Sequence, residues 1–151
     1  MRRHRVMWIV IADGSRARIV AKRAGVEGYE VVATMDSPEA HEPSHLIGGE
    51  RLGRSQESQY SARHAIEPRH DPHQERLAAF VNSVAAFLNE RAAGHDCDEL
   101  ILFAPARALG QLRRALDEAV VHKIRAQSPK DLTKLPLDEL PAHVAALLSP
   151  Q

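Results

Sequence analysis

The chain has 151 residues, a formal net charge of zero at neutral pH and a single cysteine, Cys97. This length suits one domain over residues 1–151, and its 44% of hydrophobic residues suffices for a core. A single cysteine excludes an intrachain disulfide and favours a reducing, cytoplasmic location. No apolar stretch reaches the ~20 residues that cross a bilayer, so we expect no membrane segment.

The first part of the chain predicts three antiparallel strands. Val6–Ala12 is a continuous β-favouring run, typical of a central strand buried on both faces. It is short and leads directly into Asp13, which argues against a signal peptide. Asp13 and Gly14 indicate a tight turn, because Asp accepts hydrogen bonds from nearby backbone and Gly tolerates positive φ. Ala17–Lys22 and Tyr29–Met35 then predict the two returning strands.

Residues 36–70 carry no regular apolar pattern. Prolines, glycines and polar residues are spread through them. A loop of this length inside one domain is uncommon, and it is usually functional or disordered. We therefore expect residues 36–70 to form a mobile or projecting loop.

A helix is predicted after this loop. Asp71 is typical of an N-cap and Pro72 of the first helical position, and Gln74 completes a capping-box pattern. Gly94 is the predicted end. Apolar residues recur between these points at steps of three and four, which is the period of one helix face: Leu77, Phe80, Val81, Val84, Phe87 and Leu88.

The remaining elements alternate between strand and helix. Glu99–Ala104 predicts a buried strand, Pro105 the start of a second helix, and His122–Ala126 a weaker strand. Residues 137–148 predict a last helix, in which Pro141 is tolerable only in the first turn. Strands that follow a helical crossover lie parallel to the strand that they rejoin. We expect an α/β fold of three layers, with a five-stranded mixed sheet in the order 3-2-1-4-5, as in ribonuclease-H-like domains and the release-factor middle domain.

Three parts of the chain resemble one known family. They are VMWIVIADGSRARIV near the start, RHAIEPRHDPHQERLAAFVNSVAAFLNE in the middle, and LILFAPARALGQLRRAL with SPKDLTKLPLDELPAHV toward the end. In order and spacing these segments resemble the host attachment protein family. That family is grouped with bacterial relatives of the peptide-releasing domain of archaeal and eukaryotic release factors. The resemblance implies their fold and suggests a role on ribosomes or peptidyl-tRNA.

The resemblance also implies a catalytic tip. Release factors carry Gly-Gly-Gln on the loop after the third strand, where the motif helps water to attack the peptidyl-tRNA ester. Gly48, Gly49 and Glu50 occupy the same loop here. Two glycines would let the backbone approach the ester and offer an N–H to an oxyanion. Glu50 departs from the family's amide and adds a negative charge, and a Gly-Gly pair is also common in loops that are merely flexible.

Four cations are candidates for binding RNA or phosphate: Arg54 and Arg63 in the loop, Arg107 near a helix start, and Lys130 after the last strand. Lys130 could instead pair with Asp131 as part of a local cap.

Charge is also concentrated locally. Residues 1–23 hold seven Lys and Arg against one acid, a net +6, and residues 107–134 hold seven against three, a net +4. We expect part of these cations to share one side of the molecule, although dispersed, solvated helix faces are the alternative.

The sequence gives little support for a metal site or for a nucleophilic residue. His41 and His45 have helical ligand spacing, but Pro43 prevents that helix and no cysteine joins them, so no metal and no cofactor are expected. The first predicted strand offers only apolar residues, and the acids of the fourth, Asp96, Asp98 and Glu99, lie at its wrong end for a two-metal nuclease. Cys97 stands between two aspartates, which disfavour its thiolate.

Two functions remain. The first is a release-factor-like protein that acts on ribosomes or peptidyl-tRNA, as a rescue factor or ester hydrolase, and influences host attachment indirectly. The second is a non-enzymatic cytosolic adaptor or regulator whose long loop binds a protein or RNA partner. The sequence does not predict the oligomeric state.

Overall fold

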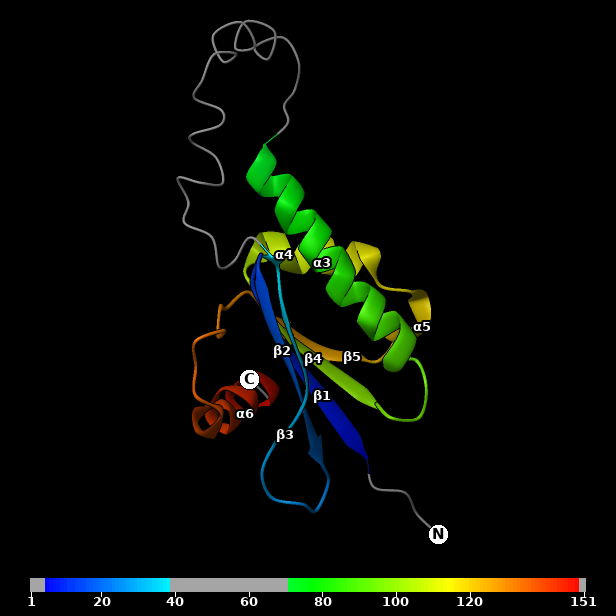
Figure 1. Ribbon diagram of the computed structural model, residues 1–151. Coiled ribbons are helices and arrows are strands. Elements are labelled where there is room, and N and C mark those ends of the chain that lie inside the picture. The colour runs from blue at the N-terminus through cyan, green and yellow to red at the C-terminus, as the bar shows by residue number, and fades with distance from the viewer. Residues whose placement is uncertain (1–4, 39–70, 150–151) are drawn as a thin grey trace, which may run out of the picture.

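A five-stranded sheet with helices on both faces makes up the computed structural model, which describes residues 5–38 and 71–149 (Figure 1). The elements are β1 Val6–Ala12, β2 Arg16–Arg23, β3 Glu30–Asp36, α3 Pro72–Arg91, β4 Glu99–Phe103, α4 Ala106–Ala115, α5 Glu118–Val121, β5 Ile124–Ser128, the 3-10 turn η3 Leu137–Glu139 and α6 Leu140–Leu148.

The sheet has the predicted order, β3-β2-β1-β4-β5. β1 is central, since it pairs antiparallel with β2 and parallel with β4. β3 pairs antiparallel with β2, and β5 pairs parallel with β4. The two parallel strands each follow a helix, as a crossover requires. The predicted α/β fold of three layers is therefore confirmed.

β1 is apolar throughout because both of its faces are covered. Trp8 and Val10 lie in the core beneath α3 and α4, whereas Ile9 and Ile11 lie in a second core beneath α6. All four side chains are buried. Successive strand residues point to opposite faces, so a strand between two helical layers needs apolar residues at every position.

Helix α3 begins as predicted and ends earlier. The Asp71 carboxylate accepts a hydrogen bond from the backbone N–H of His73 at 3.0 Å, and Pro72 is the first helical residue. The helix stops at Arg91, with Ala92 as its C-cap, so Gly94 is not the end. The carbonyls of Ala92 and Gly94 accept instead from the Lys123 ammonium, which closes the helix end.

The fifth strand also differs from its prediction. It spans Ile124–Ser128 instead of His122–Ala126, because the short helix α5 takes up the preceding residues. The N–H of His122 bonds the carbonyl of Glu118 at 3.1 Å as part of that turn. In α6, Pro141 lies in the first turn, the one place where a helix tolerates it at no cost.

Candidate functional site

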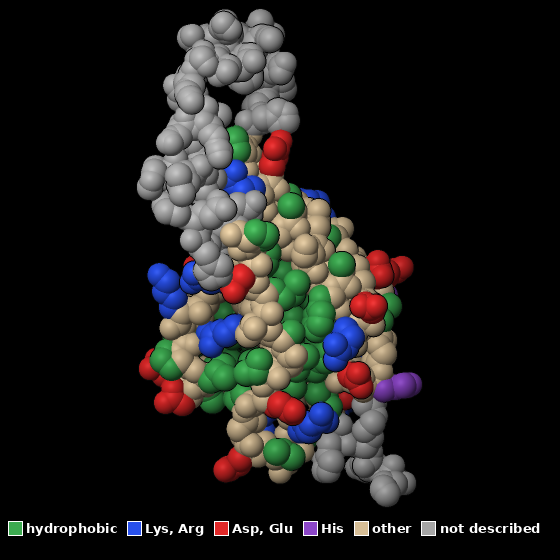
Figure 2. Space-filling view, in the orientation of Figure 1, with side chains coloured by type: hydrophobic (Ala, Val, Ile, Leu, Met, Phe, Trp, Pro, Cys, Tyr) green, Lys and Arg blue, Asp and Glu red, His purple; other side chains and the backbone are tan. Residues whose placement is uncertain are grey.

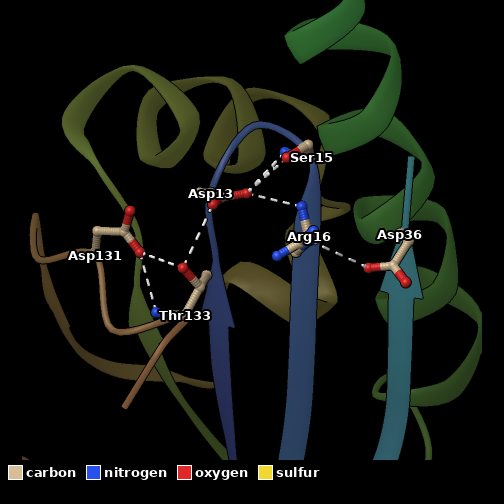
Figure 3. A network of polar contacts seen from close by, with 6 residues as sticks. All are labelled: Asp13, Ser15, Arg16, Asp36, Asp131 and Thr133. Carbon is tan, nitrogen blue, oxygen red and sulfur yellow. Dashed lines mark hydrogen bonds and ion pairs between the residues drawn. The ribbon is translucent and has the colours of Figure 1, made fainter. Parts of the chain in front are cut away.

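The three parallel strands end together at one edge of the sheet. Ala12, Phe103 and Ser128 close β1, β4 and β5 there. In sheets of this kind ligands bind outside the carboxyl ends of the strands. Figure 3 shows the polar network at this edge, which joins the turn after β1, the end of β3 and the connector after β5.

Asp13 shapes the turn after β1. Its Oδ1 accepts from the backbone N–H of Ser15 at 2.8 Å and of Arg16 at 2.7 Å. The Asp13 N–H in turn donates to the Arg16 carbonyl at 2.9 Å. The interpretation of Asp13 as a turn residue is therefore confirmed, and its carboxylate is engaged in structure.

The other Asp13 oxygen reaches the connector after β5. Thr133 Oγ1 lies 3.4 Å from Asp13 Oδ2 and 2.6 Å from Asp131 Oδ1 (Figure 3). Asp131 Oδ1 also accepts from the Thr133 N–H at 3.0 Å, so Asp131 forms a local cap, but with Thr133 and without the suggested ion pair to Lys130. On the α6 side, the Arg18 guanidinium donates to the carbonyls of Leu132 and Leu135 at 3.0 and 2.7 Å. The connector is thus held by the turn after β1 and by β2.

The turn after β1 also contacts the described chain on both sides of residues 39–70. On the β3 side, the Ser37 N–H donates to the Ser15 carbonyl at 2.7 Å, and Arg16 Nε lies 3.9 Å from Asp36 Oδ1. On the α3 side, Gly14 abuts Leu77, since a Cβ at position 14 would lie 3.1 Å from Leu77 Cδ1. One turn therefore fixes the place where the chain leaves β3 and the first turns of α3.

Two of the candidate cations lie near this network. Arg107 is exposed in the first turn of α4, and Lys130 is exposed just after β5. Neither forms a hydrogen bond or an ion pair with another described residue. Lys134 is exposed in the same connector, and the sequence did not single it out. Gly48, Gly49, Glu50, Arg54 and Arg63 lie outside the described residues.

Many of the other cations serve the opposite end of the sheet. Arg5 and Arg125 pair with Glu99 at 3.2 and 3.3 Å, and Arg23 lies 3.9 Å from Glu30. The positive charge counted along the sequence is therefore divided between two ends. Only part of it lies at the carboxyl edge.

Thr133 was missed by sequence reasoning. An aspartate two residues before a hydroxyl residue is a known turn signal, so Asp131 and Thr133 could have been predicted as a local cap. Their contact with Asp13 could not, because 120 positions of sequence separate Thr133 from it.

Cys97 is not part of this site. It is fully buried at the opposite end, and its thiol donates to the Glu99 carbonyl at 3.3 Å. Burial raises the pKa of Cys97 to about 11, which leaves almost no thiolate at neutral pH. Within residues 5–38 and 71–149, no group of three or more His, Cys, Asp or Glu could hold a metal ion. None of the described helices is long and apolar enough to cross a membrane.

Two solved structures align with this chain. The crystal structure of the archaeal translation termination factor aRF1 aligns with a TM-score of 0.49 and 11% identity, over 93% of this chain and 41% of that chain. A structure described as an archaeal protein aligns with a TM-score of 0.43 and 14% identity, over 93% of this chain and 33% of that one. This chain thus spans less than half of either.

At the level of sequence, no curated protein matches the chain. One family does match, over residues 8–144, which is most of the chain, and its description is "Protein required for attachment to host cells". The chain belongs to this host attachment family.

Proposed function

We propose that this protein is a cytoplasmic, translation-linked factor of release-factor type that acts on ribosomes or peptidyl-tRNA. The observation that carries the proposal is the turn Asp13–Arg16, which contacts both described flanks of residues 39–70. That segment contains Gly48, Gly49 and Glu50. A loop that must place a few backbone atoms against an ester gains from rigidly held ends, because positioning lowers the entropic cost of reaction.

The reaction would be hydrolysis of the ester between peptide and tRNA. A water oxygen attacks the ester carbonyl carbon, and a backbone N–H of Gly48 or Gly49 stabilises the oxyanion. The bond to the tRNA ribose oxygen then breaks, and a proton originating from the water passes to that oxygen. Glycine is suited to this position because it lacks a side chain that would block the approach.

The exposed cations would contact RNA. Arg107 and Lys130 have no partner among the described residues, so their charges are available for phosphates. In the loop, Arg54 and Arg63 would act near the same strand of RNA. These contacts would position the loop on the RNA, and the backbone N–H of Gly48 or Gly49 would stabilise the oxyanion.

The test is release of a labelled peptide from ribosomes whose decoding site is empty. The variants are Gly48→Ala with Gly49→Ala, and Glu50→Gln, beside wild type. We expect the double alanine variant to lose activity at unchanged stability. Glu50→Gln should raise activity, because it removes a charge that repels RNA and restores the family's amide. If wild type and Glu50→Gln release no more peptide than buffer does, the hydrolase proposal is wrong.

One observation favours a second function, a non-enzymatic adaptor. Glu50 replaces the amide, and a carboxylate at the tip opposes approach to RNA phosphates. Co-sedimentation with ribosomes separates the two functions. Binding that falls after charge reversal at Arg107 and Lys130 supports the translation role. Absence of the protein from the ribosome pellet, together with a stable protein partner, supports the adaptor.

A further inference from the structure

Three arginines surround a glycine on the exposed side of α4. The opposite side of this helix is buried in the core through three apolar side chains: Ala108, Leu109 and Leu112. The exposed arginines are Arg107, Arg113 and Arg114, and the helix contains no acidic residue. Gly110 lies three or four residues from each of them, which makes it their neighbour on the helix surface. The three side chains thus form an arginine triangle around Gly110.

Two arginines of the triangle are held by neutral amides. Arg113 Nη1 donates to Gln127 Oε1 on β5 at 2.9 Å, and Arg114 Nη2 donates to Gln111 Oε1 at 2.9 Å. Gln111 Nε2 donates in turn to Asn82 Oδ1 on α3, also at 2.9 Å. An amide oxygen positions a guanidinium without neutralising its charge. Because a guanidinium has five N–H donors, most of them remain available to a ligand.

Arginines elsewhere in the described chain are paired with carboxylates. Arg125 lies 3.3 Å from Glu99, and Arg23 lies 3.9 Å from Glu30. On the face that carries β3 and α3, Figure 2 shows Lys and Arg side chains interspersed with Asp and Glu. The arginines of the triangle form no ion pair with a residue that the structure describes. The exposed side of α4 therefore differs from these regions in having positive charge without acidic partners.

The acids nearest to the triangle lie outside it. Asp117 and Glu118 follow the end of α4. On the neighbouring helix, Glu75 precedes Asn82 by seven residues, which is about 10 Å along α3. The α3 side chains that bond α4 and its end are the amides Asn82 and Asn89. No carboxylate of α4 or of these bonded positions offsets the three guanidinium groups.

Glycine at position 110 is not required by packing. Among the described residues, a Cβ there would meet only Arg114 Nη1, at 3.6 Å, which is an ordinary contact. Glycine is also one of the poorest helix formers, so alanine would favour the helix more. What glycine provides is a bare position at which the backbone of a ligand can approach closely. A phosphate suits this position, because its several oxygens can accept from guanidinium groups on different sides.

The surroundings of the triangle favour a nucleic acid over a protein partner. Protein interfaces depend on buried apolar and aromatic anchors. The large hydrophobic side chains that are exposed among the described residues are Val26 and Val31, and neither lies on α4. A surface of arginines and amides without apolar anchors is typical of contacts with a phosphate backbone.

We propose that the exposed side of α4 binds the phosphate backbone of RNA, with one phosphate over Gly110 held by the arginine triangle. The choice of RNA rests on the proposed function. The surface itself contacts phosphates and does not read bases, so binding should depend little on base sequence. Arg113 and Arg114 thereby join Arg107 in the RNA-binding surface.

The experiment measures binding of the purified full chain to fluorescent hairpins by anisotropy, without ribosomes. The probes are two RNA hairpins of unrelated sequence and a DNA hairpin that matches one of them. We expect the two RNA hairpins to bind equally and the DNA hairpin to bind no more tightly. Because peptide release is not involved, a protein that binds hairpins through α4 but releases no peptide would retain this inference and lose the hydrolase proposal.

The first comparison separates the triangle from total charge. Arg113→Ala with Arg114→Ala should weaken RNA binding by about tenfold or more, and the slope of log affinity against log salt should fall by roughly two. Arg23→Ala with Arg125→Ala is the matched control, since it removes the same charge from exposed arginines that lie beside carboxylates. It should change affinity by less than about twofold.

The second comparison tests Gly110 itself. Gly110→Glu and Gly110→Gln add side chains of the same size, but only Glu places a negative charge inside the triangle. Gly110→Glu should bind RNA about tenfold more weakly than Gly110→Gln. Thermal denaturation should show both variants at least as stable as wild type, because Glu and Gln are better helix formers than Gly.

Four results would overturn the proposal. The first is no binding of either RNA hairpin up to about 0.1 mM protein at low salt. The second is an equal loss of affinity in the two double variants, which would assign binding to net charge. The third is tighter binding of the DNA hairpin than of RNA. The fourth is binding of polyglutamate as tight as that of RNA, which would make an acidic protein the partner.

Discussion

The two ends of the sheet use charged side chains in different ways. At the amino end of the parallel strands, Lys123 donates to three backbone carbonyls at 2.7 to 2.8 Å, and Glu99 holds Arg5 and Arg125. At the carboxyl edge, Asp13 and Asp131 accept from backbone and hydroxyl groups, while Arg107 and Lys130 form no hydrogen bond or ion pair with a described residue. The amino end thus uses these cations within the fold, whereas the carboxyl edge, beside the engaged Arg16 and Arg18, leaves Arg107 and Lys130 exposed.

This difference shows that the net charge of a sequence segment does not give the number of cations available to a ligand. Residues 107–134 carry a net +4, yet that figure includes Lys123 and Arg125, which are engaged within the fold. A cation that already satisfies buried carbonyls has no protons left to offer a phosphate. The availability of a charge depends on its partners, and the following predictions test that distinction.

The largest effect on stability is expected for Lys123→Met. It leaves the carbonyls of Ala92, Gly94 and Cys97 without their donor, so we expect a loss of about 3 kcal/mol in the free energy of unfolding. Urea denaturation measures it. Lys130→Met is the matched control, because exposed Lys130 should change stability by no more than about 0.5 kcal/mol. Similar losses in both variants would show that the two ends do not differ as described.

Cys97 should behave as an inert core residue. Burial raises the pKa of its thiol from 9.0 to about 11, so at pH 8 the native protein holds about a hundredfold less thiolate than a free thiol would. Alkylation by iodoacetamide should therefore be at least about a hundredfold slower in the native protein than in urea. Fast native labelling would mean that this end opens readily.

The same shift predicts a dependence of stability on pH. The folded protein favours the neutral thiol, and the unfolded chain ionises first. The contribution of Cys97 is then fully present below pH 9 and is lost as the pH rises toward about 11. Relative to Cys97→Ala, wild type should lose stability across that interval, as followed by urea denaturation at each pH. If the free energy of unfolding depends on pH in the same way in both proteins, the pKa of Cys97 is not raised by folding.

At the carboxyl edge, Asp13→Ala should lower the free energy of unfolding by about 2 kcal/mol, because the backbone N–H groups of Ser15 and Arg16 lose their acceptor. Asp13→Asn should lower the free energy of unfolding by less, because an amide oxygen can still accept in place of Oδ1. Hydrogen exchange at Ser37 should accelerate in Asp13→Ala, because the turn that holds it loosens. If Ser37 exchange is unchanged, the turn does not anchor this flank.

The smallest effect on stability is expected for Arg107→Glu combined with Lys130→Glu. Both side chains are exposed and have no hydrogen-bond or ion-pair partner among the described residues, so the free energy of unfolding should change by no more than about 0.5 kcal/mol. If the proposed RNA contact exists, affinity for ribosomes should fall, and the slope of log affinity against log salt should decrease by roughly one for each cation lost. Unchanged affinity and slope would remove both residues from the proposed interface.

Much of the fold could be read from local patterns. The apolar run Val6–Ala12 predicted a strand covered on both faces, and Asp13 with Gly14 predicted the turn. Asp71 with Pro72 predicted the start of α3. These signals depend on neighbouring residues alone. The errors fell at Gly94 and at β5, where Lys123 binds the end of α3 and a single turn of helix precedes the strand.

The sequence by itself determined most of the elements, their order and the topology of the sheet, because periodicity, turn residues and crossover chirality act locally or along the chain. Tertiary structure alone decided which charges are engaged. Arg18 donates to Leu132 and Leu135 across 114 and 117 positions, and Thr133 meets Asp13 across 120. Such contacts depend on which strands and connectors meet at an edge of the sheet. The spacing of residues along the chain does not predict them.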